Sequence, residues 1–176
     1  DALNHACIID AMRLTTVIKK GVHKAVYKHS DMEHCREVLV KARETAGDTG
    51  VIWLVTDGGF SMEGDLGNLP GLRNLCDEFG ALLVVDDSHG TGVMGETGRG
   101  THEYWDMDPS QIDVFTGTLG KALGGGAGGY LAGTKTAMEM IVQRARPTLF
   151  SNALPCTVAA SAAKAIEVVD REPDRV

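Results

Sequence analysis

The sequence predicts an α/β fold in which a central, mostly parallel sheet is flanked by helices. Two continuous apolar runs, at residues 51–56 and 81–85, have the length and composition of strands that are buried on both faces. A segment with helical periodicity, Leu69–Phe79, separates them. A strand, a helix and a second strand in this order are typical of a parallel sheet.

Weaker patterns predict the remaining elements of a single domain over residues 1–176. Ser30 or Asp31 is the expected N-cap of a polar helix that ends at Ala46 and turns Val38 and Leu39 inward. Gly21 is the expected stop of the first helix. Short strands are expected at 22–27, 113–116 and 128–132, and further helices at 6–20, 134–144 and 156–170.

The composition is that of an ordinary globular protein. With 176 residues the chain can bury one core, and its net charge of −7 argues against a nucleic-acid surface, which needs clustered Lys and Arg. No apolar run reaches the roughly 20 residues of a membrane span, and the first residues lack a signal-peptide pattern. We therefore expect no nucleic-acid or membrane partner. The missing initiator Met indicates a piece of a longer chain.

Cysteine and most of the histidines do not predict a metal site. No CxxC pair or zinc spacing occurs, so we expect reduced, buried cysteines at Cys7, Cys35, Cys76 and Cys156. Four histidines without evident partners are expected at the surface: His23, His29, His34 and His102.

Glycine is unusually frequent, and its distribution points to a site. The 22 glycines crowd at 58–67, 90–100 and 117–133, in each case after a predicted strand. Glycine is favoured where the backbone turns tightly or approaches a ligand closely. Because ligands of such sheets bind at the carboxyl ends of the strands, we expect these three loops to meet at one edge.

The third loop places a lysine among small residues, in Thr116-Gly117-Thr118-Leu119-Gly120-Lys121-Ala122-Leu123-Gly124-Gly125. An ammonium group without a neighbouring carboxylate is poorly solvated there, which favours the neutral amine that forms a Schiff base. A surface lysine on a flexible loop is the alternative. A phosphate-binding P-loop is excluded, since Ala122 stands where that motif needs Ser or Thr.

The second loop begins with Asp86-Asp87-Ser88-His89-Gly90. A carboxylate at a strand end could hold the proton of a cationic cofactor ring, and His89 could bond a ring oxygen. An ordinary turn is the alternative, because Asp and Ser commonly cap turns. A metal site would need further ligands at useful spacing.

Two other segments carry weaker signals. In Thr56-Asp57-Gly58-Gly59-Phe60-Ser61-Met62-Glu63-Gly64-Asp65, Ser61 could donate to a cofactor oxygen. Asp57 and Glu63 fit solvated loop charges equally well. In Asn4-His5-Ala6, His5 could stack on an aromatic ring, although a lone histidine near a terminus commonly has no such role.

Taken in order, the four motifs resemble the α-oxoamine synthases, a family of fold-type I pyridoxal-phosphate (PLP) enzymes. The resemblance extends through Arg144-Ala145-Arg146-Pro147 and Leu149-Phe150-Ser151-Asn152. It implies the aspartate aminotransferase-like large domain, pyridoxal 5′-phosphate as cofactor, and condensation of an amino acid with an acyl-CoA. Glycine and acetyl-CoA are the expected substrates. A homodimer with its site at the subunit interface is also implied, in the cytoplasm or, in a eukaryote, the mitochondrial matrix.

By position, the resemblance also assigns roles. Lys121 is the Schiff-base lysine and moves the α-proton, Asp86 pairs with the pyridine nitrogen, and His89 bonds the ring hydroxyl oxygen. The other cofactor contacts fall on His5, which stacks on the ring, on Ser61, which approaches the ring oxygen, and on Thr118 and Ser151, which contact the phosphate. Ser151 is expected to do so across a dimer interface.

The sequence departs from the family pattern in detail and in length. Cys7 stands where Ser is usual, Gly59 where Val or Ala is usual, and Gly126-Ala127 where Ala-Ser is usual, which weakens the choice of acyl donor. Members are much longer, so we expect an N-terminal segment and a C-terminal domain to be missing. An inactive cofactor-domain fragment, or a phosphate-binding α/β domain without PLP chemistry, is the alternative.

Overall fold

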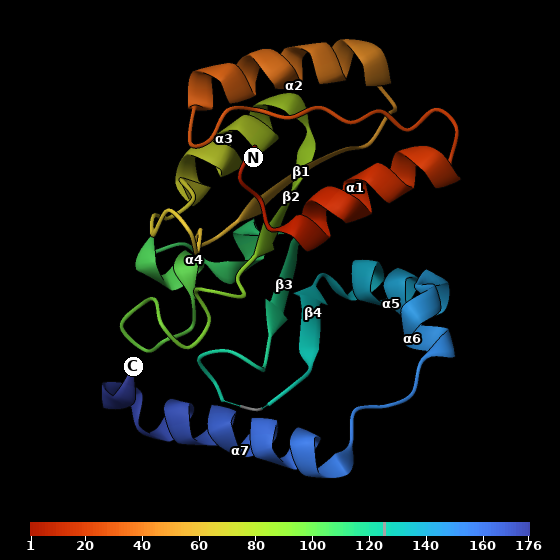
Figure 1. Cartoon of the computed structure of the whole chain (residues 1–176). Coiled ribbons are helices and arrows are strands. Elements are labelled where there is room, and N and C mark those ends of the chain that lie inside the picture. Colours follow the sequence, from red (N-terminus) through yellow and green to blue (C-terminus); the bar gives the residue numbers. More distant parts are fainter. Residues whose placement is uncertain (125) are drawn as a thin grey trace.

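The computed structural model describes residues 1–124 and 126–176 (Figure 1). Gly125, the last residue of the lysine motif, lies outside the described residues. The elements are, in order, α1 (Ala6–Ile18), α2 (Met32–Ala46), β1 (Ile52–Asp57), α3 (Leu69–Phe79), β2 (Ala81–Asp86), α4 (Thr101–Tyr104), β3 (Val114–Thr118), β4 (Gly129–Gly133), α5 (Lys135–Arg144), α6 (Arg146–Phe150) and α7 (Cys156–Arg171).

The four strands form one mixed sheet in the order β1-β2-β3-β4. β1, β2 and β3 run parallel, and β4 returns antiparallel to β3. The prediction of an α/β fold with a mostly parallel sheet is confirmed. Figure 1 shows α2 and α3 together beside β1 and β2, with α7 at the opposite end of the molecule.

The main core lies between β1, β2, α2 and α3. Alternate strand residues such as Leu54 and Leu83 point into it and meet Leu39 of α2 and Leu72 of α3. The opposite face of β1 is more open, since Trp53 is 45% exposed. The prediction that β1 is buried on both faces is therefore wrong for this face.

Local capping sets the ends of the two core helices. The Asp31 side chain accepts a hydrogen bond from the His34 amide and starts α2, and Asn68 does the same for α3 through Gly71. Gly80, with φ 60°, ends α3 in the left-handed conformation that favours glycine.

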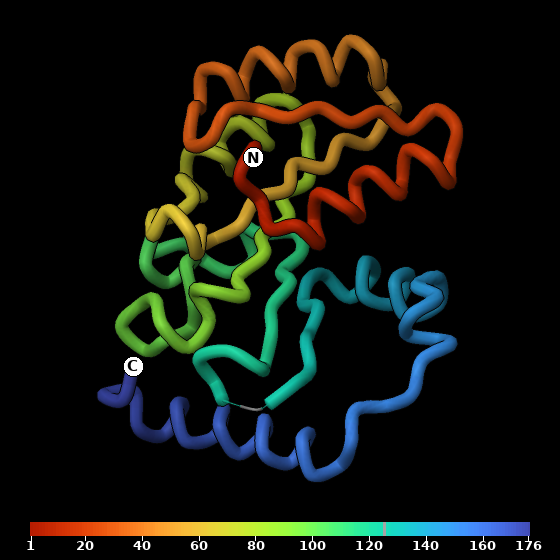
Figure 2. Tube along the Cα trace, viewed as in Figure 1, coloured from red at the N-terminus to blue at the C-terminus, as the bar shows by residue number. Residues whose placement is uncertain are grey.

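Three expectations need correction. Residues 22–27 form no strand; they run extended beside α2 (Figure 2), and no edge of the described sheet pairs with them. Two short helices were also missed, α4 and α6. α6 begins at Arg146 with a proline in its first turn, where a missing backbone N–H costs nothing.

Cysteine burial follows the layers. Cys35 and Cys76 are buried in the core as expected, whereas Cys7 and Cys156 are exposed, which corrects the prediction for these two. Cys7 lies in the first turn of α1, a helix without a buried residue.

Within the described part of the chain, no helix combines the length and apolar character of a membrane crossing.

Arg43 links the ends of the two core helices. Its guanidinium donates to the carbonyls of Phe79 and Gly80 at the end of α3, and to those of Gly47 and Gly50 after α2. These carbonyls belong to helix ends and connections that offer few other donors.

Replacing Arg43 with methionine is expected to lower the free energy of unfolding by about 1–3 kcal/mol, because half-buried carbonyls lose their donors. Arg36→Met, which removes an exposed ion pair with Glu78, is the control and is expected to cost less than about 1 kcal/mol. Urea denaturation followed by circular dichroism measures both. Equal losses would contradict a special role of the carbonyl contacts.

Candidate cofactor site

Three polar residues lie side by side at the carboxyl edge of the parallel strands. Asp57 of β1 pairs in register with Asp86 of β2, and Asp86 pairs with Thr116 of β3. Because paired residues of neighbouring strands point to the same face, all three side chains lie opposite the main core. The three predicted loops therefore start from one edge of the sheet, as expected.

Asp86 sits at the centre of this edge and is half-buried. Its Oδ1 accepts a 2.9 Å hydrogen bond from the Ser88 amide of its own loop. Among the residues that the structure describes, none donates to Oδ2. One carboxylate oxygen thus has no donor within residues 1–124 and 126–176 and is available to a bound molecule.

His89 is held beside the first loop. A Cβ built on Gly59 would lie 3.6 Å from the Cβ of His89, so the two loops touch there. Burial lowers the pKa of His89, the positive charge of Lys121 lowers it further, and Asp86 opposes the shift. His89 therefore lies within electrostatic reach of both Asp86 and Lys121.

Lys121 projects from the connection between β3 and β4, and its side chain is exposed. The connection is closed by its own hydrogen bonds: Thr118 Oγ1 donates to the Gly128 carbonyl at 3.1 Å and accepts from the Gly120 amide at 3.2 Å. The carbonyl of Lys121 accepts from the Gly124 amide at 2.9 Å. In the described structure, the Thr118 hydroxyl thus shapes the turn that carries Lys121.

His5 is brought to the same edge by its neighbour Asn4. The Asn4 side chain is buried, donates to the Val55 carbonyl at 2.9 Å and accepts from the Asp57 amide at 3.2 Å. The His5 amide then donates to the Asp57 carboxylate at 3.1 Å. His5 caps α1, with its ring accepting from the Cys7 amide.

The sequence left open whether Asp57 is a solvated loop charge or a functional residue. The structure shows that the solvated interpretation is wrong. It is 4% exposed, and burial raises its pKa to about 6, with the charge of Asp86 adding to the shift and the His5 amide opposing it. Its place at a strand end, directly before the first glycine loop, is the sequence signal that favoured the functional interpretation.

The raised pKa of Asp57 has a consequence for stability. Between its ordinary value of 3.8 and about 6, the folded state binds more protons than the unfolded state, so the free energy of unfolding falls as pH rises through this window. Asp57→Asn is expected to flatten this fall in urea titrations from pH 4 to 7. Glu63→Gln, an exposed carboxylate in the next loop, controls for net charge. An unchanged profile in Asp57→Asn would contradict the assignment.

Two predicted contacts lie apart from this cluster. Ser61 is exposed in the turn after Gly59, the residue that touches His89. Ser151 is exposed between α6 and α7, and its hydroxyl donates to the Pro147 carbonyl. Nothing in the described structure joins Ser151 to Lys121, although Leu154 of the same connection packs on Gly128.

The histidines assigned to the surface divide into two groups. His23 is exposed, as expected, whereas His34 and His102 are half-buried. His29 is wrong as a surface residue: its ring nitrogens lie 3.0 Å from Asp1 and 2.8 Å from Asp65. It thereby ties the N-terminal segment to the Ser61 loop, a contact that no local pattern reveals.

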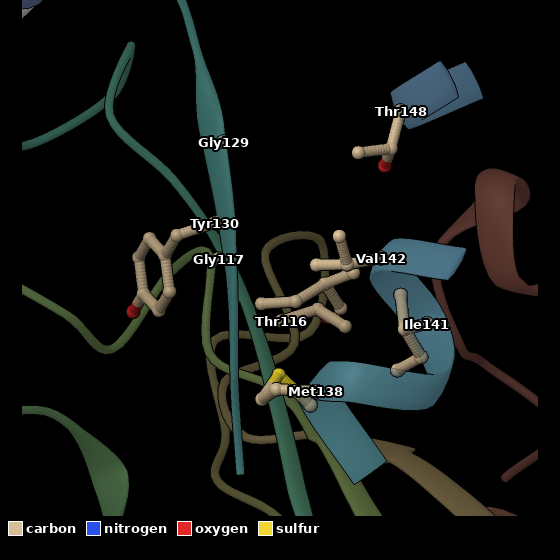
Figure 3. A pocket seen from close by; sticks show the side chains of 9 residues that line it. Thr116, Gly117, Gly129, Tyr130, Met138, Ile141, Val142 and Thr148 are labelled. Atoms are coloured by element: carbon tan, nitrogen blue, oxygen red, sulfur yellow. The ribbon is translucent and has the colours of Figure 1, made fainter. Parts of the chain in front are cut away.

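An apolar cleft of about 570 Å³ opens next to the edge, between β3, β4 and α5 (Figure 3). Met138, Ile141 and Val142 of α5 face it, together with Thr116, the register partner of Asp86. Tyr130 points away from these side chains (Figure 3). Asp86, His89 and Lys121 do not line the cleft, so we place the chemistry at the sheet edge, where the ionisable groups gather.

The donor set at the edge fits a charged aromatic cofactor. The Asp86 carboxylate could accept from a ring nitrogen, and the His89 imidazole could bond a ring oxygen. The exposed amine of Lys121 could attach to a carbonyl carbon, and the His5 imidazole at the start of α1 could lie on the ring face. Within residues 1–124 and 126–176, no three His, Cys, Asp or Glu side chains gather as metal ligands. This set of side chains suits a cofactor that is attached through a lysine.

A family model for class I and II aminotransferases matches residues 1–176, and the chain belongs to that family. It is 47% identical over 170 residues to 2-amino-3-ketobutyrate coenzyme A ligase of Escherichia coli K12, covering 97% of this chain and 41% of the relative. It is 42% identical over 176 residues to 8-amino-7-oxononanoate synthase of Symbiobacterium thermophilum, covering 100% of this chain and 42% of the relative.

Solved structures agree with these relatives. Serine palmitoyltransferase of Sphingomonas wittichii matches with a TM-score of 0.86 at 29% identity, over 99% of this chain and 41% of that one. The S. paucimobilis enzyme, solved with a bound PLP–myriocin adduct, matches with a TM-score of 0.83 at 28% identity, over 96% and 40%. The resemblance to α-oxoamine synthases is thus confirmed, and the cofactor is pyridoxal 5′-phosphate. The chain spans about two fifths of the length of these relatives.

Proposed function

We propose that the intact protein condenses glycine with acetyl-CoA to give 2-amino-3-oxobutyrate and CoA, the glycine C-acetyltransferase reaction of threonine catabolism. The gathering of Asp86, His89 and Lys121 at one sheet edge carries the proposal. The identity to 2-amino-3-ketobutyrate coenzyme A ligase, 47% against 42% for 8-amino-7-oxononanoate synthase, favours acetyl-CoA as donor.

The proposed chemistry divides among the named side chains. PLP, when bound, supplies an electron sink for negative charge at the α-carbon of glycine. Lys121 would hold the cofactor through Nζ, and with glycine bound its free amine would accept the α-proton. Asp86 keeps the ring nitrogen protonated by accepting its hydrogen bond, and His89 donates to the ring oxygen. A carbon–carbon bond then forms to the acetyl carbonyl, the thioester C–S bond breaks, and the CoA sulfur takes a proton.

The outer contacts complete the proposal. His5 lies against the ring, and Ser61 donates to the ring oxygen. Thr118 and Ser151 hold the phosphate, with Ser151 acting across the interface of a homodimer. The exposure of Ser151 and its distance in sequence from the cluster are consistent with such a role. We place this reaction in the cytoplasm or the mitochondrial matrix.

The substrate assignment is tested by mass spectrometry of the products. The intact protein with PLP is given glycine and a series of acyl-CoA donors, and CoA is measured by chromatography, because exposed Cys7 and Cys156 would consume thiol reagents. We expect 2-amino-3-oxobutyrate with acetyl-CoA and slower turnover of longer donors. Turnover of long donors alone would favour an 8-amino-7-oxononanoate synthase-like activity. No product from any donor would favour an inactive cofactor domain.

A further inference from the structure

Asp87 is the neighbour of Asp86 but serves a different part of the fold. It follows the last residue of β2 and is 1% exposed, whereas Asp86 is half-buried at the site edge. Its carboxylate accepts from the Thr101 amide at 3.1 Å and from the Thr101 hydroxyl at 2.6 Å. It also accepts from the Thr91 hydroxyl at 3.2 Å.

Three glycines make room for this carboxylate. A Cβ built on Gly58, Gly90 or Gly100 would lie 2.5, 2.2 or 1.8 Å from an Asp87 carboxylate oxygen. The first belongs to the loop after β1 and the other two to the loop after β2. These glycines of the predicted site loops therefore enclose a buried side chain of the chain itself.

The hydrogen bonds continue from Asp87 toward β4. The hydroxyls of Thr91 and Tyr130 are 2.7 Å apart. Thr91 has one hydroxyl proton and donates it to Asp87, so Tyr130 donates to Thr91. Burial raises the pKa of Tyr130, the bond to Thr91 opposes the shift, and the charges of Asp87 and Asp86 add to it. The raised pKa keeps the phenol protonated, so that it can donate.

Tyr130 in turn contacts the strand that leads to Lys121. It pairs in register with Gly117, and a Cβ on Gly117 would lie 2.4 Å from the Tyr130 ring. On the other side of Lys121, a Cβ on Gly92 would lie 3.2 Å from Leu123. The loop after β2 therefore meets the Lys121 connection directly after the lysine, and it reaches the strand before the lysine through the bond from Thr91 to Tyr130.

We propose that Tyr130, Thr91 and Asp87 form a positioning relay that sets the Lys121 connection against the loop carrying Asp86 and His89. The relay reaches the site from the opposite face of the sheet, and its members are positioning residues that do not touch the cofactor. The inference rests on the proposed function, because it concerns how the same site is assembled.

The first test measures covalent PLP on Lys121. The intact protein is incubated with limiting PLP, reduced with borohydride, digested and quantified by mass spectrometry. Tyr130→Phe keeps the ring beside Gly117 and removes only the hydroxyl; we expect the Lys121 adduct to fall about three- to tenfold. Thr91→Val is expected to do the same, and Thr91→Ser, which keeps the hydroxyl, to restore the wild-type yield.

A matched control separates positioning from stability. Tyr27 is buried, 6% exposed, and its hydroxyl lies near Thr56, away from the Lys121 connection. Tyr27→Phe is expected to lower the unfolding temperature and leave the adduct yield unchanged. The adduct yield of the double variant Tyr130→Phe/Thr91→Val should be no lower than that of the weaker single variant, because both substitutions break the same hydrogen bond between Tyr130 and Thr91. Additive losses, or a Tyr130→Phe yield equal to that of Tyr27→Phe, would overturn the relay.

A second measurement does not need the cofactor. Amide hydrogen exchange of the PLP-free protein is followed in peptides covering 119–124. We expect about three- to tenfold faster exchange there in Tyr130→Phe and wild-type rates in Tyr27→Phe. Equal exchange in both variants would reject the relay. A wild-type protein without a Lys121 adduct would reject the proposed function, and the exchange result would still decide the relay.

Discussion

Replacing Lys121 with alanine is expected to abolish covalent PLP binding and to lower turnover by about 10²–10⁴-fold. The primary amine of Lys121 is both the attachment point and the base in the proposed reaction, and no other lysine of the described residues is among the charges that shift the pKa of His89. The side chain is exposed, so the free energy of unfolding should change by less than about 0.5 kcal/mol.

Lys135→Ala is the matched control. Lys135 is another exposed lysine, on α5, with only a loose 3.9 Å approach to Glu139. Borohydride reduction followed by peptide mapping should find the pyridoxyl group on Lys121 in the wild type and in Lys135→Ala. The assignment would be refuted if Lys121→Ala carried as much pyridoxyl group as the wild type, or if the adducts were scattered over surface lysines.

The two adjacent aspartates are expected to respond in opposite ways to the same substitution. Asp86→Asn keeps the Oδ1 acceptor for Ser88 and removes the charge at the open edge. We expect turnover to fall about 10²–10³-fold, with the free energy of unfolding changed by less than about 0.5 kcal/mol. The loss would be one of charge beside the cofactor ring.

Asp87→Asn is expected to act mainly on stability. Thr101 and Thr91 donate hydrogen bonds to both carboxylate oxygens of Asp87. An asparagine NH₂ group in place of either oxygen would therefore face donors, in a space that the neighbouring glycines leave too small for it to move away. The expected cost is about 1–3 kcal/mol of unfolding free energy. Turnover should fall less than in Asp86→Asn.

Thermal or urea unfolding and product formation, measured on both variants of the intact protein, separate the two cases. If Asp87→Asn lost more activity per unit of stability than Asp86→Asn, the roles of the two carboxylates would have to be exchanged. If both variants behaved alike, the division between the open and the buried face would not hold in solution.

Local signals in the sequence were sufficient for most elements. α3 has the predicted bounds because Asn68 caps its start and Gly80 adopts a left-handed turn at its end. β1 and β2 follow from short apolar runs, although β1 lies at an edge of the described sheet and leaves Trp53 exposed. The strand predicted at 22–27 is absent because an extended segment becomes a strand only where the fold lays it against a sheet edge. This segment runs beside α2 instead (Figure 2).

The sequence by itself determined the strands, the helices with strong caps, and the ordered motifs that place Asp86, His89 and Lys121 at one edge of the sheet. Only the tertiary structure decided that Asp86 is open and Asp87 buried, that Asp57 lies out of water, and that Tyr130 reaches Thr91. These properties depend on strand register and on contacts between residues far apart in the chain. Burial and hydrogen bonding are set by such neighbours, and one-dimensional patterns do not name them.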